Sequence, residues 1–194
     1  TRTRLALSTD KDGVDSVGQK SDTVSFMPVA GLNPVGDFEL VDQDGNVFDQ
    51  DNPAWQSEYK LIYFGFTFCP AICPTELHKM TVALNDLPAE KADKVQPIFI
   101  SVDPERDTPQ VMKKYTSMFH ERFIGLTGSV EQVDHMKSLW KVFATKVDDP
   151  AMSEYTVDHS SYIYMQGPEG NVLGLFRIRD NAQAIADYMA KVIP

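Results

Sequence analysis

The two cysteines of the chain, Cys69 and Cys73, lie close together in the segment Cys-Pro-Ala-Ile-Cys-Pro. A disulfide that closes so small a loop restricts the unfolded chain only weakly, so the pair indicates redox or metal chemistry. The structural alternatives are a small buried disulfide or two inert core thiols. As thiolates, the pair would select Cu(I), zinc or an iron–sulfur cluster over hard cations, but two thiolates alone leave a metal site incomplete.

The chain has four histidines that could complete such a site. His78 and His135 fall outside the apolar faces of expected helices, and His120 follows the apolar end of another, so surface positions explain all three. His159 differs, because it stands where a loop enters a strand, far along the chain from the cysteines. Spacing alone leaves two interpretations of His159 open: a ligand from a second segment, or a loop residue that caps a hairpin.

Hydrophobic periodicity predicts the elements that hold the cysteines. Residues 61–66 form a short apolar run, typical of a strand buried on both faces, and the cysteines follow its C-terminal end. From Pro74 to Leu87 apolar residues recur at spacings of three and four, which predicts a helix with Pro74 at its first position. Because a helix N-terminus carries partial positive charge, we expect Cys73, the nearer thiol, to be the more acidic.

The remaining elements alternate between strands and helices. We expect an N-terminal hairpin around Asp44-Gly45, then in chain order a strand over 97–102, a helix from about Pro109 carrying Val111, Tyr115 and Met118, a strand over 124–126, a helix over 130–143, a hairpin of 161–165 with 172–176, and a helix over 184–192. This order predicts an α/β, thioredoxin-like fold. Its mixed central sheet is parallel first and antiparallel at one side, is flanked by helices on both faces, and gains an N-terminal β-hairpin.

Length and composition indicate one folded domain over 28–194 after a flexible leader or tether over 1–27. The formal net charge of −10 gives no compositional support for binding nucleic acid. The sequence contains no run of 18 apolar residues that could span a membrane. We expect a fragment that was separated from an N-terminal membrane anchor, although a cloning scar would give a similar start.

Three segments of the chain together resemble the signature of the Sco family, also called SenC or PrrC. They are residues 63–77 with the C-P-x-x-C-P motif, residues 101–108 with Asp-Pro-Glu-Arg-Asp-Thr, and residues 157–160 with Val-Asp-His-Ser. Their order makes the resemblance specific, and it extends from about residue 28 to the C-terminus. It implies a thioredoxin-like domain that binds one copper ion, as Cu(I) or Cu(II), through Cys69, Cys73 and His159.

The resemblance also implies a function and a location. The domain would be a copper metallochaperone that delivers copper to the Cu-A centre of cytochrome c oxidase subunit II, with thiol-disulfide reductants and other copper carriers as further partners. It would be tethered to the inner membrane and face the periplasm, or alternatively lie in the mitochondrial intermembrane space.

An enzymatic function uses the same thiols. In a thiol-disulfide oxidoreductase, Cys69 and Cys73 would be catalytic and would reduce the cysteines of the copper acceptor site. A pure oxidoreductase does not need His159, so this residue favours the carrier, although reduction and copper delivery could be successive steps. A peroxidase similar to the peroxiredoxins is a third hypothesis, weakened because their cysteine motif is absent.

Two further features bear on the site. Ala71 stands where the family often has Asp, so a carboxylate beside the thiols is missing, which affects thiol pKa or reduction potential. The charged residues Asp103, Glu105, Arg106 and Asp107 either form a loop cluster that shapes the turn into the next helix or orient the site and dock a partner. Carboxylates suit harder ions than Cu(I), so we do not expect them to be copper ligands.

Overall fold

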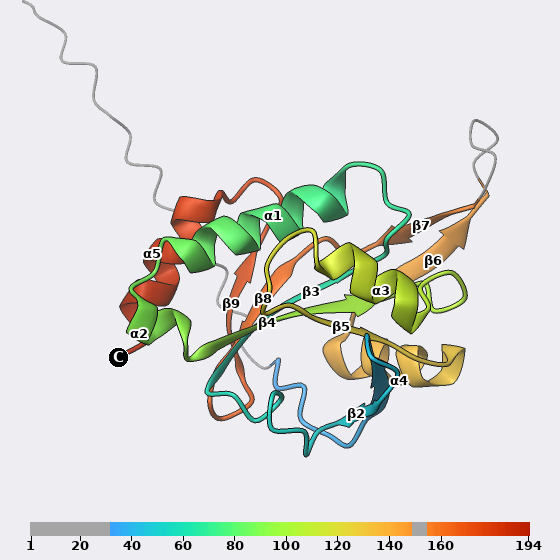
Figure 1. Cartoon of the computed structure of the whole chain (residues 1–194), viewed down its shortest axis with the longest axis horizontal. Helices are drawn as coiled ribbons and strands as arrows, with labels where there is room; N and C mark the ends of the chain where they lie inside the picture. Colours follow the sequence, from blue (N-terminus) through green and yellow to red (C-terminus); the bar gives the residue numbers. More distant parts are fainter. Residues whose placement is uncertain (1–31, 149–154) are drawn as a thin grey trace, which may run out of the picture.

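A computed structural model describes residues 32–148 and 155–194, so the expected leader over 1–27 lies outside the described residues. Its centre is a seven-stranded sheet in the order β2-β1-β5-β4-β3-β8-β9 (Figure 1). The middle strands β3 (Tyr59–Gly65), β4 (Val95–Ser101) and β5 (Ile124–Thr127) run parallel. Every residue of β3 is buried, as expected for an apolar run covered on both faces.

Antiparallel strands extend both sides of the parallel core. β1 (Glu39–Asp42) and β2 (Val47–Asp49) form the expected hairpin, and β1 pairs with β5. β8 (Ile163–Gln166) and β9 (Val172–Phe176) form the second hairpin, and β8 pairs with β3. The expectation of antiparallel strands at one side was therefore incomplete, because the N-terminal hairpin joins the same sheet.

The helices divide unequally between the two faces of the sheet. On one face, α1 (Ile72–Asn85), α3 (Pro109–Thr116) and α5 (Ala182–Val192) lie together, as Figure 1 shows. The other face is covered by α4 (Val130–Trp140), whose Trp140 ring packs against Phe64 of β3. A short helix, α2 (Ala89–Ala92), links α1 to β4.

Three expected helices have different ends from those that periodicity indicated. α1 begins at Ile72, so Pro74 occupies the third helical position, still within the first turn where backbone N–H groups lack helical acceptors. α3 ends at Thr116, and Met118 is exposed beyond it. α4 ends at Trp140 because Lys141 adopts a left-handed backbone conformation, which leaves Phe143 outside the helix and exposed.

A two-stranded sheet, β6 (Ala144–Val147) paired with β7 (Thr156–His159), was not expected from the sequence. Most of β6 is exposed, and its residues do not alternate between apolar and polar, so the sequence did not indicate a strand there. This sheet changes the placement of His159, which is the last residue of β7 and not part of a loop.

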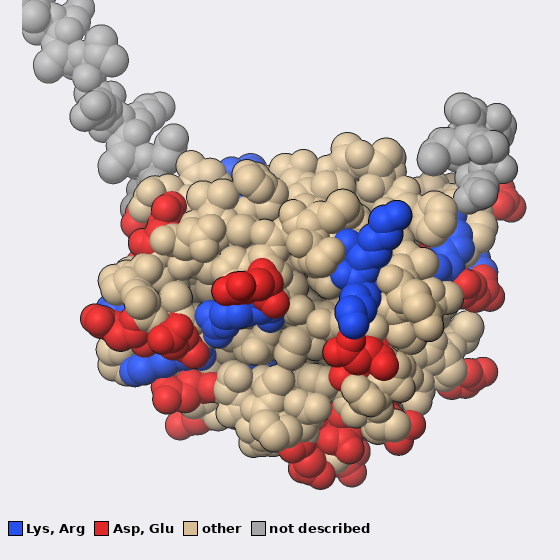
Figure 2. Space-filling view, in the orientation of Figure 1, with Lys and Arg blue, Asp and Glu red and all other residues tan. Residues whose placement is uncertain are grey.

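The surface follows the acidic composition of the chain. Figure 2 shows separate clusters of acidic side chains along the lower part and the sides of the face in view, in line with the formal net charge of −10. Among the described residues, no helix has the length and apolar composition required to cross a membrane.

Candidate metal centre

Three segments bring the sequence-predicted ligands together beyond the C-terminal end of β3. The loop after Gly65 carries Cys69, the first turn of α1 carries Cys73, and the end of β7 carries His159. The two sulfur atoms and an imidazole nitrogen all lie within 4.8 Å of one another. In the described part of the chain, no other group of three His, Cys, Asp or Glu side chains is close enough to hold a metal ion.

Cys73 is the buried member of the cluster. Its Sγ lies 3.6 Å from His159 Nε2, and the Tyr63 hydroxyl donates a hydrogen bond to it at 3.7 Å. Gly65 leaves the space that this sulfur occupies, since a Cβ added there would approach Cys73 Sγ to 2.8 Å. Tyr63 and Gly65 were assigned only to the strand, because nothing in an apolar run marks which residues face a site.

Cys69 lies nearer to the surface and carries the more acidic thiol. Its interaction with the Cys73 thiol, opposed by burial, lowers the pKa of Cys69 to about 4. The backbone N–H of Cys73 donates a hydrogen bond to Cys69 Sγ at 3.4 Å. The same interaction between the two thiols, together with burial, raises the pKa of Cys73.

The expected order of thiol acidity was therefore wrong. Because α1 begins at Ile72, Cys73 lies inside the first turn and is fully buried, while Cys69 receives the N–H group that this turn leaves free.

His159 is oriented as a ligand from a second segment should be. Its Nδ1 lies 2.9 Å from the carbonyl oxygen of Ser160, which can only accept a hydrogen bond. In the neutral imidazole the proton is therefore on Nδ1, and the lone pair of Nε2 faces the thiols. The rings of Tyr63 and Phe66 meet the imidazole edge-on at centroid distances of 6.2 Å and 5.6 Å and hold it in place.

The other three histidines lie elsewhere. His78 is exposed on α1. His120 Nδ1 accepts the backbone N–H of Arg122 at 3.1 Å, and His135 Nε2 lies 2.8 Å from the carbonyl oxygen of Asp37. The structure therefore separates them from the cysteines.

Asp107 ties the cysteine-bearing loop to the end of β4. Its fully buried carboxylate accepts the Thr67 hydroxyl at 2.5 Å, the Thr67 backbone N–H at 3.2 Å and the Ser101 hydroxyl at 2.6 Å. Burial raises the pKa of this carboxyl. Asp107 thus fixes the position of the loop two residues before Cys69, and does not itself join the metal-ligating cluster.

Arg106 connects the same loop to the small β6–β7 sheet. Its guanidinium group stacks on Tyr155 at 3.7 Å and on Phe68 at 4.6 Å, and it pairs with Asp103 at 2.5 Å. Asp103 also accepts the Tyr155 hydroxyl at 2.7 Å. Glu105, the fourth charged residue of this loop, pairs with Lys146 of β6.

The donor set suits a soft metal ion. Two thiols and one imidazole converge beside the aromatic rings of Tyr63 and Phe66, with no carboxylate in the described cluster. Thiolates favour Cu(I), and imidazole is a common copper ligand, so the residues present fit copper. The same two thiols, close together with unequal pKa values, could also exchange with a disulfide.

The chain is similar to known proteins over the range that contains Cys69, Cys73 and His159. A family model described as SCO1/SenC matches residues 30–194. The SCO2-like protein of Rickettsia felis is 43% identical over 158 residues, covering 79% of this chain and 74% of that protein. The mitochondrial protein SCO2 of Saccharomyces cerevisiae is 40% identical over 161 residues, covering 77% of this chain and 53% of that protein.

Solved structures confirm the expected thioredoxin-like α/β fold. The crystal structure of Arabidopsis thaliana ScoI with copper bound has a TM-score of 0.72 at 36% identity, covering 80% of this chain and 95% of that one. BsSco, a member of the Sco family of cytochrome c oxidase assembly proteins in which a disulfide switch was identified, has a TM-score of 0.59 at 26% identity. That match covers 86% of this chain and 97% of BsSco.

Proposed function

Because the chain belongs to the SCO1/SenC family, we propose that it is a copper metallochaperone that binds one copper ion through Cys69, Cys73 and His159. The convergence of two thiols and an imidazole nitrogen within 4.8 Å is the observation that carries this proposal. The copper-bound ScoI structure of Arabidopsis thaliana supports the choice of metal.

Each of the three residues contributes differently to copper capture. Cys69 is a thiolate at neutral pH and offers a charged ligand without losing a proton. Cys73 holds the proton that must leave when its sulfur binds, so copper uptake releases one proton from the thiol pair. His159 presents the lone pair of Nε2.

Copper is the cargo of this site, and we propose that it passes to the Cu-A centre of cytochrome c oxidase subunit II. The membership of BsSco in a family of cytochrome c oxidase assembly proteins supports this acceptor. Thiol-disulfide reductants and other copper carriers would act before delivery, because only reduced thiols bind copper.

The domain would work outside the cytoplasm, tethered to the inner membrane and facing the periplasm. The mitochondrial intermembrane space is the alternative. The mitochondrial relative from Saccharomyces cerevisiae supports this second location.

A copper titration tests the carrier function. The reduced protein should bind one Cu(I) per chain, and the form oxidised to a Cys69–Cys73 disulfide should bind none, because a disulfide sulfur is not a thiolate ligand. Anaerobic competition against a chromophoric Cu(I) chelator measures both stoichiometries. Equal stoichiometry for the two forms would contradict the proposal.

A second candidate function is reduction of the acceptor's disulfide, favoured by the low pKa of Cys69. The Cys69 thiolate would attack one sulfur of that disulfide, and the other sulfur would leave as a thiolate. Cys73 would then lose its proton and attack Cys69 Sγ, which releases the acceptor as a dithiol and leaves a Cys69–Cys73 disulfide. The disulfide switch of BsSco supports this chemistry.

The substitution His159→Ala separates the two functions, with His78→Ala as the matched control because His78 is exposed and is not part of the metal-ligating cluster. For a carrier, His159→Ala weakens copper binding at least about tenfold while disulfide exchange with a small dithiol changes much less. Copper competition and exchange rates are measured on both variants. Unchanged copper affinity with lost thiol reactivity would identify the protein as an oxidoreductase.

A further inference from the structure

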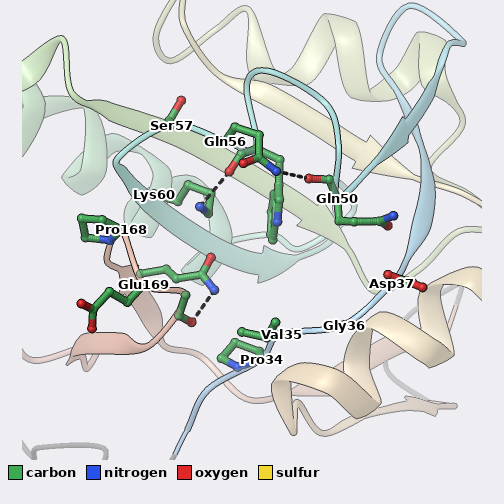
Figure 3. Close-up of a pocket in the computed structure, with 13 residues that line it drawn as sticks. Pro34, Val35, Gly36, Asp37, Gln50, Gln56, Ser57, Lys60, Pro168 and Glu169 are labelled. Carbon is green, nitrogen blue, oxygen red and sulfur yellow. Dashed lines mark hydrogen bonds between the residues drawn. The ribbon is translucent and has the colours of Figure 1, made fainter.

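A second hollow lies at the opposite end of β3 from the cysteines. Lys60 is near the start of this seven-residue strand, whereas the cysteines follow its end, so about 17 Å of strand separates the two sites. Figure 3 shows the walls of the hollow, which come from residues 34–37, 50–60 and 166–170. Its volume is about 340 Å³, enough for a molecule the size of an amino acid.

Lys60 supplies a buried charge to this hollow. The residue is 5% exposed, and its ammonium group donates one hydrogen bond to the carbonyl oxygen of Trp55 at 2.8 Å. It also lies 5.0 Å from the centre of the Trp55 ring. No carboxylate pairs with Lys60 within residues 32–148 and 155–194, and burial lowers its pKa to about 8. Since an ammonium group has three donors, two remain for a ligand.

Gln166 supplies a buried acceptor beside this charge. It is 2% exposed and stands opposite Lys60 in the antiparallel register of β3 and β8. Its Nε2 donates to the carbonyl oxygen of Gly170 at 2.7 Å, which fixes the orientation of the amide. Its Oε1 is buried and has no hydrogen-bond partner among the described residues. An unpaired buried acceptor is uncommon, because burying it without a hydrogen bond costs free energy. A ligand that donates a hydrogen bond to Gln166 Oε1 would remove this cost.

We propose that this hollow binds an α-amino carboxylate, either as a free amino acid or as the last residue of a peptide. The ligand's carboxylate pairs with Lys60, and the N–H group next to it donates to Gln166 Oε1. The rings of Trp55 and Pro168 and the exposed side chain of Val35 line the same hollow and provide contacts for an apolar ligand side chain.

The charges around the hollow favour this ligand class over inorganic phosphate. Asp37 and Glu169 also line the hollow, and both are exposed (Figure 3). Two carboxylates near a single ammonium group disfavour a dianion, whereas they attract the ammonium group of a free amino acid.

A ligand series tests the proposal on the intact, isotope-labelled protein by NMR. The probes are leucine, N-acetyl-leucine, leucinamide and inorganic phosphate, and the reporters are the side-chain amide of Gln166 and the indole N–H of Trp55. Leucine should shift both signals in a saturable way, whereas leucinamide, which lacks the carboxylate, and phosphate should not. A matching shift with N-acetyl-leucine identifies the last residue of a peptide as a ligand, and its absence identifies a free amino acid. No shift with either carboxylate, or an equal shift with leucinamide or phosphate, overturns the proposal.

Substitutions connect the binding to the two buried residues. Lys60→Met keeps the apolar stem but removes the charge, and should weaken binding of the active probe at least about tenfold. Gln166→Met should also weaken it, while Lys113→Met, at an exposed lysine, should not. Unchanged affinity in a folded Lys60→Met variant contradicts the proposal, and if that variant does not fold, the wild-type ligand series decides the question.

Discussion

At the scale of single residues, the two thiols have distinct roles that their spacing does not reveal. Cys69 accepts a hydrogen bond from the backbone N–H of Cys73, whereas Cys73 is enclosed by Tyr63, Gly65 and His159. The interaction between the two thiols lowers the pKa of Cys69 and raises that of Cys73, so the pair shares one proton at neutral pH. Copper capture and disulfide exchange would both begin at Cys69.

This asymmetry predicts a pH-dependent difference in thiol reactivity. In the wild-type protein, Cys69 should react with iodoacetamide at pH 6, well above its pKa of about 4, while Cys73 stays unmodified until a more alkaline pH. Mass spectrometry of peptides from protein labelled across a pH series assigns each modification. Earlier labelling of Cys73 would show that the helix N-terminus has a larger effect on thiol acidity than the interaction between the two thiols.

At the scale of elements, the sequence was most informative where apolar residues follow a regular period. The run over 61–66 predicted β3, and the three-and-four spacing after Pro74 predicted α1, so the order strand, cysteine loop, helix could be derived from the sequence alone. Helix ends were less predictable. Met118 and Phe143 continue an apolar pattern but lie outside α3 and α4. The left-handed backbone of Lys141 ends α4 before Phe143, whereas α3 ends at Thr116 without such a residue.

The residues and strands that hold the site in place were harder to derive from the sequence than its ligands. The cysteines and His159 belong to motifs, but β6 and β7 show no apolar alternation, and the tie between Thr67 and Asp107 joins residues 40 positions apart. Such contacts depend on the parallel pairing of β3 with β4, which places the ends of both strands at one edge. The contacts of the charged loop support both interpretations. Arg106 pairs with Asp103 within the turn, and Asp107 orients the cysteine-bearing loop through Thr67.

Asp107 gives a prediction at this scale. Asp107→Ala leaves the Ser101 and Thr67 donors unpaired and should lower the free energy of unfolding by about 1–3 kcal/mol. Asp107→Asn keeps one acceptor oxygen and should cost less. Chemical denaturation of both variants measures the two differences, and an Asn variant as unstable as the Ala variant would contradict the hydrogen-bonding role.

The pH dependence of stability provides an independent check. Since the pKa of Asp107 is raised on folding, the folded protein holds this proton more tightly than the unfolded chain does. The contribution of the protonated Asp107 carboxyl to the free energy of unfolding is therefore fully present below the ordinary carboxyl pKa, and it is lost as pH rises through the pKa of the folded protein. Asp107→Asn should remove this part of the pH dependence. A variant with the same stability–pH profile as the wild type would contradict the raised pKa of Asp107.

At the scale of the whole molecule, the metal-ligating cluster and the hollow proposed to bind an α-amino carboxylate lie at opposite ends of one sheet. The thiols and His159 lie beyond the C-terminal end of β3, while Lys60 and Gln166 lie near its start. Helices α1, α3 and α5 cover one face and α4 the other, so the strand between the sites is fully buried. The fold thus places the metal-ligating cluster at the C-terminal end of a central strand, and that strand stays fully buried.

X-ray absorption at the copper K-edge tests the central claim most directly, because it reports the atoms bound to the metal. In the reduced protein loaded with one Cu(I), the account predicts two sulfur ligands and one imidazole nitrogen at a single copper, with the imidazole signal lost in His159→Ala and retained in His78→Ala. A spectrum without sulfur ligands, or an imidazole signal that survives in His159→Ala, would contradict the proposed copper site.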